Sequence, residues 1–139
     1  MKKRIVTNDD IRSYTLEVIR QMNDDCWTPE IVLGFSRGGL VPANYISQWY
    51  NIPLFCINKD IEFQCNLESY KEVLIIDDIN DSGNTLYDFK SRYGENQGFK
   101  YAALIDNTGS KFITDYAGHY INKMEVPDWI VFPWEIWWQ

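Results

Sequence analysis

The stretch VLIIDDINDSGNTL, residues 73–86, decides the fold prediction because an apolar run leads directly into acidic and small polar residues. The run 73–76 is apolar at every position, which is typical of a strand buried on both faces in a parallel sheet. Asp77 and Asp78 follow at once, and Asp81 comes three residues later. Adjacent carboxylates repel each other, so we expect this strand end to face a ligand.

The rest of the chain alternates between strand and helix patterns. Apolar runs at residues 30–35, 52–57 and 99–106 predict strands, and residues 7–22, 40–51 and 84–94 have helical patterns. Thr7 and Asp10 have the spacing of a capping box at the start of the first helix. The alternation predicts an α/β fold, a mostly parallel twisted sheet flanked by helices. We expect one domain over residues 1–139, ending in a small aromatic hood that is irregular from about Thr108 onward.

Charge and composition exclude several classes of function. The net charge is −7 and the Lys and Arg residues are dispersed, which argues against nucleic-acid binding. No apolar segment is long enough to span a bilayer, and the basic N-terminus lacks the apolar region of a signal peptide. The three cysteines lack metal-ligand spacing and are expected to be reduced thiols. We therefore expect a cytoplasmic protein without nucleic-acid or membrane partners.

Residues 81–85, DSGNT, have the character of a phosphate-binding loop. A small glycine-containing turn between a strand and a helix exposes backbone N–H groups, and the helix N-terminus favours an anion. The candidate residues are Ser82, Gly83, Asn84 and Thr85. Helix capping by Asp81 or Ser82 is an equally good interpretation of this pentapeptide alone. The loop lacks the Gly-Lys-Ser/Thr of a Walker motif, which argues against an ATPase.

Two further features complete a candidate site. Asp77 and Asp78 could accept hydrogen bonds from a vicinal diol or hold a hard dication such as Mg²⁺. Residues 34–39, GFSRGG, offer a second anion site, although a tight turn with an exposed arginine would have the same sequence. In parallel sheets ligands bind at the carboxyl ends of the strands. We therefore expect both loops, with Asp106, to converge on a ribose phosphate carrying a second anionic group.

Residues 73–86 resemble the ribose-phosphate signature of the type I phosphoribosyltransferases: an apolar strand, two acids and a Ser-Gly-x-Thr loop. SRGGLVPA, residues 36–43, resembles the pyrophosphate loop and following helix of the bacterial xanthine–guanine phosphoribosyltransferases. IVTNDDI (5–11), VLGFSRGGLVP (32–42) and PDWIVFPWE (127–135) are also similar to segments of that subfamily, in the same order. The resemblance covers nearly the whole chain and is weaker at residues 57–70 and after 106.

The resemblance implies transfer of a 5-phosphoribosyl group from phosphoribosyl pyrophosphate to a purine nitrogen, with release of pyrophosphate and Mg²⁺ on the donor. The 5′-phosphate would lie on residues 82–85, and Asp77 and Asp78 would hold the ribose hydroxyls, with Asp78 also binding the metal. The pyrophosphate would bind to Arg37 and its neighbours Ser36, Gly38 and Gly39. A strained or cis peptide before Arg37 is also implied. Arg37 and Asp81 are the implied catalytic residues, with Asp81 beside the purine N7.

The acceptor side is less well defined by the resemblance. Trp129 would stack on the purine, and the backbone of Ile130 would reach its edge. Asp106 stands where the subfamily has a lysine that donates to the 6-oxo group, which would favour a 6-amino group instead. Lys111 could supply the missing charge, or the alignment could be shifted. The segment 58–70 is expected to be a short form of the family's mobile loop.

Three functions therefore stay open. A purine phosphoribosyltransferase of the xanthine, guanine and hypoxanthine type comes first. The alternatives are a phosphoribosyltransferase for a 6-aminopurine or a pyrimidine, and a regulatory protein of the same fold that senses a nucleotide. The resemblance also implies a homo-oligomer, a dimer or a tetramer.

Overall fold

The computed structural model describes residues 2–58, 67–94 and 98–139, and it confirms the predicted α/β architecture. In the described residues, five strands form one sheet in the order β3-β2-β4-β5-β6, and every neighbouring pair is parallel. The strands are β2 (Ile31–Phe35), β3 (Leu54–Ile57), β4 (Val73–Asn80), β5 (Phe99–Asn107) and β6 (Tyr116–Ile121). The signature strand β4 is central, as its apolar run predicted.

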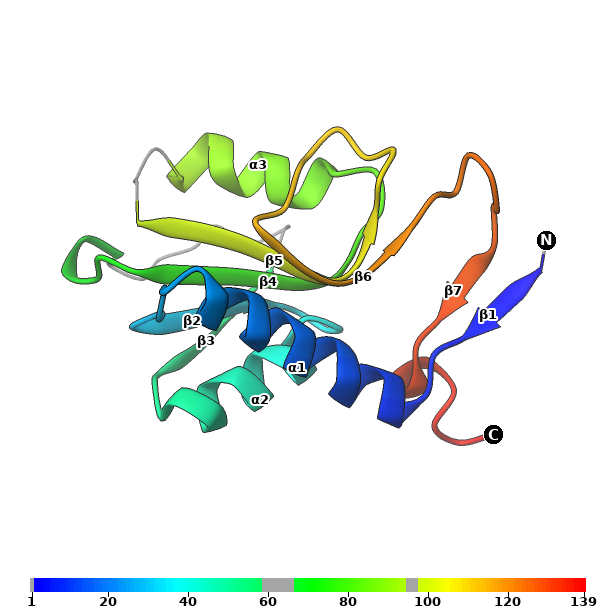
Figure 1. Ribbon diagram of the computed structural model, residues 1–139, viewed down its shortest axis with the longest axis horizontal. Helices are drawn as coiled ribbons and strands as arrows, with labels where there is room; N and C mark the ends of the chain where they lie inside the picture. Colours follow the sequence, from blue (N-terminus) through cyan, green and yellow to red (C-terminus); the bar gives the residue numbers. More distant parts are fainter. Residues whose placement is uncertain (1, 59–66, 95–97) are drawn as a thin grey trace.

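Helices cover both faces of this sheet (Figure 1). Helices α1 (Asn8–Asp24) and α2 (Leu40–Tyr50) lie on one face, and α3 (Asn84–Tyr93) lies on the other. The alternation of side chains along β4 divides the core accordingly, because Ile75 packs with Leu86 of α3 and Leu74 packs with Val18 of α1. A 3₁₀ turn, η1 (Leu67–Ser69), precedes β4. No helix in the described ranges has the length and apolar character that crossing a membrane requires.

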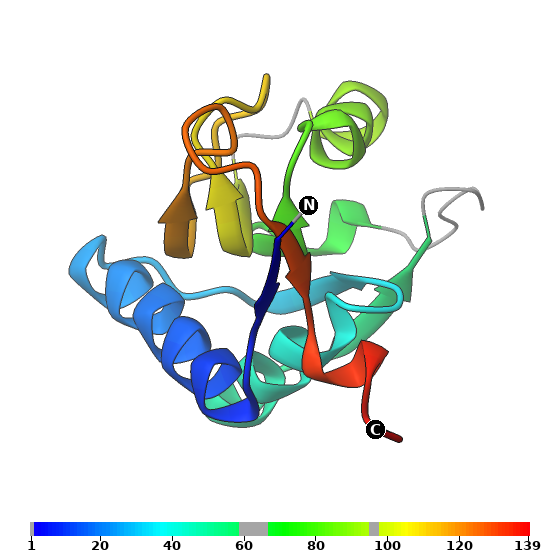
Figure 2. The ribbon, with the colours of Figure 1, turned by 90° about the vertical axis from the view of Figure 1, so that its right-hand side faces the viewer.

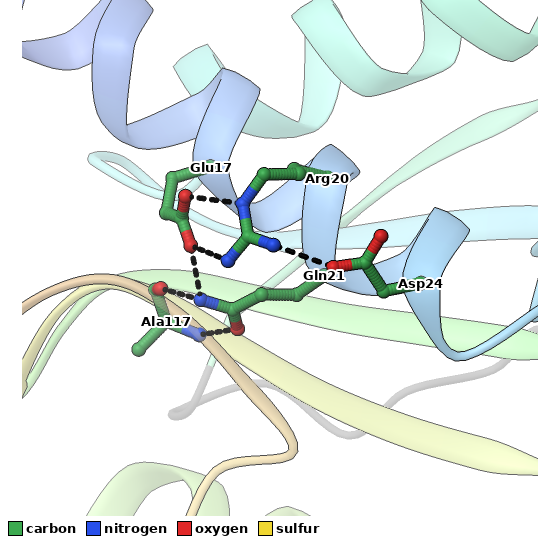
Figure 3. A network of polar contacts seen from close by, with 5 residues as sticks. All are labelled: Glu17, Arg20, Gln21, Asp24 and Ala117. Carbon is green, nitrogen blue, oxygen red and sulfur yellow. Dashed lines mark hydrogen bonds and ion pairs between the residues drawn. The ribbon is translucent and has the colours of Figure 1, made fainter.

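Helix α1 begins at the predicted capping box and fixes the edge strand of the sheet. The Thr7 N–H donates to Asp10 Oδ2 at 2.9 Å, and the Asp10 N–H donates to Thr7 Oγ1 at 3.1 Å. Further along the helix, Gln21 Nε2 donates to the Ala117 carbonyl at 2.8 Å and Gln21 Oε1 accepts from the Ala117 N–H at 3.0 Å. Figure 3 shows this pairing beside a surface network of Glu17, Arg20 and Asp24. The helix thereby supplies the partner that β6 lacks on its open edge.

The C-terminal part is more regular than the sequence suggested, so the prediction of irregular structure after Thr108 was wrong. It contains β6, the strand β7 (Trp129–Val131) and a 3₁₀ turn, η2 (Pro133–Glu135). β7 pairs in parallel with the N-terminal strand β1 (Lys3–Ile5), which the pattern also did not predict. Figures 1 and 2 show this two-stranded pair beyond the carboxyl ends of the main sheet. The aromatic hood therefore borders the edge where ligands were expected.

Candidate active site

A cavity of about 290 Å³ opens at the carboxyl edge of the sheet, between the loop after β2, the end of β4 and the hood. It joins segments that are far apart in sequence. Its lining includes six of the predicted site residues: Arg37, Gly38, Asp78, Asp81, Trp129 and Ile130. Five further residues that were not predicted also line it: Ile79, Lys123, Phe132, Trp134 and Glu135. The cavity is thus the candidate site, and its walls are richer in aromatic and charged groups than the motifs indicated.

The loop after β2 lies directly against the acid pair of β4. The peptide bond between Ser36 and Arg37 is cis, as the resemblance implied. A Cβ on Gly38 would overlap the Asp78 carboxylate, so only glycine allows this approach. Gly39 has a different role, because its N–H donates to the Phe35 carbonyl at 2.8 Å and secures the loop to the sheet. Gly38 is therefore the residue whose size sets the distance between the loop and Asp78.

The acids of β4 are held by backbone hydrogen bonds. Asp77 Oδ1 accepts from the Asp78 N–H at 2.8 Å, and Asp78 Oδ1 accepts from the Ile79 N–H at 2.8 Å. Burial raises the pKa of Asp78 above its usual range, and the carboxylate of Glu135 in the same cavity acts in the same direction. A cation between Asp78 and Glu135 would stabilise the charged form of each carboxylate.

Two carboxylates at this edge have the chemistry that a magnesium ion would require. Carboxylate oxygens are ligands that Mg²⁺ prefers, and Asp78 and Glu135 both face the cavity. Within the described ranges, no group of three or more His, Cys, Asp or Glu side chains is placed to hold a metal ion. Magnesium at this site would therefore need oxygen ligands from the bound donor as well.

One side of the cavity combines the carboxylate of Asp81, the ammonium group of Lys123 and the aromatic ring of Trp129. Lys123 Nζ donates to Asp81 Oδ2 at 2.7 Å and lies 5.6 Å from the centroid of the Trp129 ring. Asn107, at the end of β5, links the two charged residues. Its Nδ2 donates to the Asp81 carbonyl at 3.0 Å, and its Oδ1 accepts from the Lys123 N–H at 3.1 Å. Trp129 is 54% exposed, so its ring is accessible to a planar ligand.

The predicted phosphate loop lies next to Asp81, outside the lining of the cavity. Gly83 has φ = +91°, a conformation that glycine adopts without strain, and α3 begins at the next residue. The Ser82 hydroxyl accepts a hydrogen bond from the Asn84 N–H at 3.2 Å, but Gly83 occupies the N-cap position of α3 and neither Asp81 nor Ser82 caps the helix. Thr85 lies half-buried in the first turn of the helix. The loop has the form required for an anion site, and its use for the 5′-phosphate stays a prediction.

Asp106 does not contact the cavity, and the prediction that it faces the base was wrong. Its side chain is buried, with Oδ1 accepting from Asn80 Nδ2 at 2.8 Å and Oδ2 lying 3.5 Å from Thr114 Oγ1. Lys111, the suggested substitute, places its Nζ over the Tyr87 ring, 4.8 Å from the centroid. The cation beside Asp81 is Lys123 instead. Lys123 was not predicted as a site residue because the sequence pattern did not predict β6, the strand that leads to it.

Three other missed residues lie within the motif at residues 127–135. Phe132 and Trp134 stack with their ring centroids 4.8 Å apart and an interplanar angle of 5°. Glu135 Oε1 accepts from the Phe132 N–H at 2.9 Å. Their positions in PDWIVFPWE were the available signal, because the resemblance covered the whole motif and not only Trp129 and Ile130.

Comparison with known proteins gives one negative and one positive result. No protein-family model matches the sequence. Among solved structures, the chain resembles a purine phosphoribosyltransferase from Pyrococcus horikoshii with a TM-score of 0.76 and 25% identity, covering 97% of this chain and 95% of that one. It also resembles the xanthine–guanine–hypoxanthine phosphoribosyltransferase of Helicobacter pylori with a TM-score of 0.76 and 23% identity, covering 96% and 94%.

A third similar structure is a hypothetical protein from Neisseria gonorrhoeae with bound ppGpp. Its TM-score is 0.74 and its identity 21%, and the match covers 97% of this chain and 90% of that one. These likenesses extend over nearly the full length of each molecule. They agree with the resemblance of residues 73–86 to the ribose-phosphate signature and with the parallel sheet order found here. The chain therefore has the fold of the type I phosphoribosyltransferases.

Proposed function

We propose that this protein transfers a 5-phosphoribosyl group from phosphoribosyl pyrophosphate to a nitrogen of a 6-oxopurine, releasing pyrophosphate, in purine salvage. The single observation that carries the proposal is the cavity that brings Arg37, Asp78, Asp81 and Trp129 together from separate segments. An arginine, two half-buried acids and an exposed aromatic ring meet the separate needs of a donor and a planar base. The purine phosphoribosyltransferases of the same fold support this assignment.

On the donor side, the proposal assigns each group one task. The 5′-phosphate binds to residues 82–85, where backbone N–H groups and the start of α3 favour an anion. Asp77 and Asp78 accept hydrogen bonds from the ribose hydroxyls, and Arg37 with Ser36, Gly38 and Gly39 binds the pyrophosphate. Magnesium, when bound with the donor at Asp78, would offset the charge of the leaving pyrophosphate. The chain's own contribution is to fix the donor while charge separates at the ribose carbon.

On the acceptor side, the base stacks on Trp129 with its edge along the backbone of Ile130. Asp81 takes or shares the proton of the purine N7 as the base becomes a nucleophile. Lys123 provides donors beside this carboxylate, and an ammonium group favours a carbonyl over an amino group on the base. The preference for a 6-oxopurine therefore rests on Lys123 instead of Asp106.

Replacing Lys123 by methionine tests this preference. We expect kcat/KM for hypoxanthine and guanine to fall about 10- to 100-fold, the equivalent of one charge-assisted hydrogen bond, with no comparable loss for adenine. Lys111→Met is the matched control, because that ammonium lies over Tyr87 instead of beside Asp81. A change of base preference in Lys111→Met, with none in Lys123→Met, would assign the role to Lys111.

The test of the function itself is a panel of initial rates. Pyrophosphate release from phosphoribosyl pyrophosphate and Mg²⁺ is measured with hypoxanthine, guanine, xanthine, adenine and uracil. We expect turnover with at least one 6-oxopurine and little with adenine or uracil. Faster turnover of adenine or uracil would establish the alternative enzyme for a different base.

One observation favours a second candidate, a nucleotide-sensing protein without turnover. Lys123 is already paired with Asp81, so the proposed proton acceptor is occupied in this structure, and one protein of the same fold binds ppGpp. Equilibrium binding of guanine nucleotides, in a protein that turns over none of the five bases, would support this candidate over the enzyme.

The proposal includes a homo-oligomer, a dimer or a tetramer, in the cytoplasm. Trp137 and Trp138 are 77% and 64% exposed in the single chain, which is unusual for large aromatic rings and is consistent with a subunit contact. Light scattering of the purified protein would give its mass in solution.

A further inference from the structure

A buried polar cluster lies behind the phosphate loop. Asn80 is 2% exposed and Asp106 is 7% exposed, and they are paired across β4 and β5. Asn80 belongs to the signature stretch and separates the acid pair of β4 from Asp81. Neither residue lines the cavity, so the proposed reaction leaves both without a role.

Asn80 is the centre of this cluster. Its Nδ2 lies 2.8 Å from Asp106 Oδ1, 2.9 Å from Ser110 Oγ and 2.7 Å from the Phe112 carbonyl. Because a carboxylate only accepts hydrogen bonds, Asp106 fixes which end of the Asn80 amide faces it. The oriented amide in turn binds the segment 110–112. Burial raises the pKa of Asp106, while the Asn80 hydrogen bond opposes that rise.

The backbone of segment 110–112 packs against the backbone of the phosphate loop at Ser82 and Gly83. The Lys111 N–H donates to the Ser82 carbonyl at 3.1 Å. A Cβ on Gly83 would lie 2.7 Å from the Phe112 backbone nitrogen, so the two stretches are in close backbone contact. Any shift of this segment therefore displaces Ser82 and Gly83, whose N–H directions determine how well an anion is bound.

We propose that Asp106 is a positioning residue for the donor: through Asn80 it holds residues 110–112 beneath Ser82 and Gly83, and so fixes the site of the 5′-phosphate. This inference rests on the proposed function and extends it to a pair of residues that contacts no substrate. Asp106 acts on phosphate affinity and has no part in the choice of base.

The test measures the binding of ribose 5-phosphate and of guanine separately, by calorimetry and by quenching of tryptophan fluorescence. We expect Asp106→Ala to raise the Kd for ribose 5-phosphate by about tenfold, the loss of one well-placed hydrogen bond, and to leave the Kd for guanine within about twofold. Asp106→Asn keeps an acceptor oxygen and is expected to recover most of the affinity. Asp115→Ala, in the same β5–β6 connection but outside the cluster, is the matched control.

A double-mutant cycle separates positioning from general damage. Asn80→Ala should raise the same Kd by a similar factor, and the double variant should be little worse than either single one, because both act through one contact. Thermal unfolding checks that each variant is folded, and Asn80→Ala, which removes the same contact, carries the test if Asp106→Ala does not fold.

Each outcome has a distinct meaning. Ribose 5-phosphate affinities of Asp106→Ala and Asn80→Ala equal to that of the wild type would overturn the inference while leaving the proposed function intact. A change in guanine affinity without a change in ribose 5-phosphate affinity would also overturn it and would return Asp106 to the base. A wild-type protein that binds no ribose 5-phosphate would contradict the proposed function itself.

Discussion

Replacing Asp81 by asparagine is expected to lower kcat for every accepted base by about 10²- to 10⁴-fold, the usual effect of losing a positioned proton acceptor. Asparagine keeps the size of the side chain and one oxygen, but it cannot take a proton from the purine. The surrounding contacts come from Lys123 and from Asn107, whose Nδ2 donates to the Asp81 backbone carbonyl at 3.0 Å and to Asp81 Oδ1 at 3.4 Å. The backbone bond survives the substitution, so the loop should keep its position.

This prediction is checked by single-turnover rates and by donor affinity in the same variant. The affinity for phosphoribosyl pyrophosphate should stay near the wild-type value, because Asp81 acts on the base. Asp88→Asn, on the exposed face of α3, removes the same charge without touching the cavity. A kcat for Asp81→Asn within a few-fold of the control would show that Asp81 is not the proton acceptor.

Gly38→Ala is expected to lower kcat/KM for phosphoribosyl pyrophosphate by about 100-fold or more, because reacting groups displaced by about 1 Å lose that much. The new methyl group would overlap the Asp78 carboxylate, so either the loop or the acid must move. Both belong to the donor half of the site, so the affinity for the base alone should change little. Pyrophosphate binding, measured by calorimetry, should weaken in parallel.

Gly109→Ala is the matched control for this substitution. Its Cβ would meet nothing nearer than Met124 Cγ at 3.8 Å, so the same chemical change is made without a steric overlap. We expect near wild-type kinetics from it. If the kinetics of Gly38→Ala match those of Gly109→Ala, the close approach of the loop to Asp78 has no part in binding the donor.

The parts of the fold that follow from local sequence were predictable. The capping box at Thr7, the apolar run of β4 and the glycine turn before α3 each act within a few residues, and all are present. The donor half of the site shares this property, because its motifs are short and continuous. That is why residues 36–39 and 77–85 could be predicted from the sequence, and Arg37, Gly38, Asp78 and Asp81 of these line the cavity.

The acceptor half could not be predicted in the same way. β1 and β7 have three residues each and form only by pairing with one another across the length of the chain. Along β5, a one-residue change reverses the side that a residue faces, so Asp106 turns inward while Asn107 reaches Asp81. Lys123 reaches the cavity only because β6 returns the chain to it. Long-range pairing and register, which a short motif does not encode, decide these positions.

The proposed function divides one cavity between two kinds of recognition. Arg37, Gly38 and Asp78 form the donor side, and Asp81, Lys123 and Trp129 form the side proposed for the base. Because the two sides come from different segments, variants on one side should change the affinity for one substrate and leave the other nearly unchanged. In the proposal, the phosphate loop and its support by Asn80 and Asp106 belong to the donor side.

Phosphorus-31 magnetic resonance of a reaction with phosphoribosyl pyrophosphate, Mg²⁺ and hypoxanthine tests the central claim most directly. The account predicts that the donor signals disappear while pyrophosphate and a nucleotide 5′-monophosphate appear in equal amounts, and that Asp81→Asn slows both together. Donor signals that stay unchanged with hypoxanthine, guanine and xanthine, or pyrophosphate that appears with free ribose 5-phosphate and no nucleotide, would contradict it.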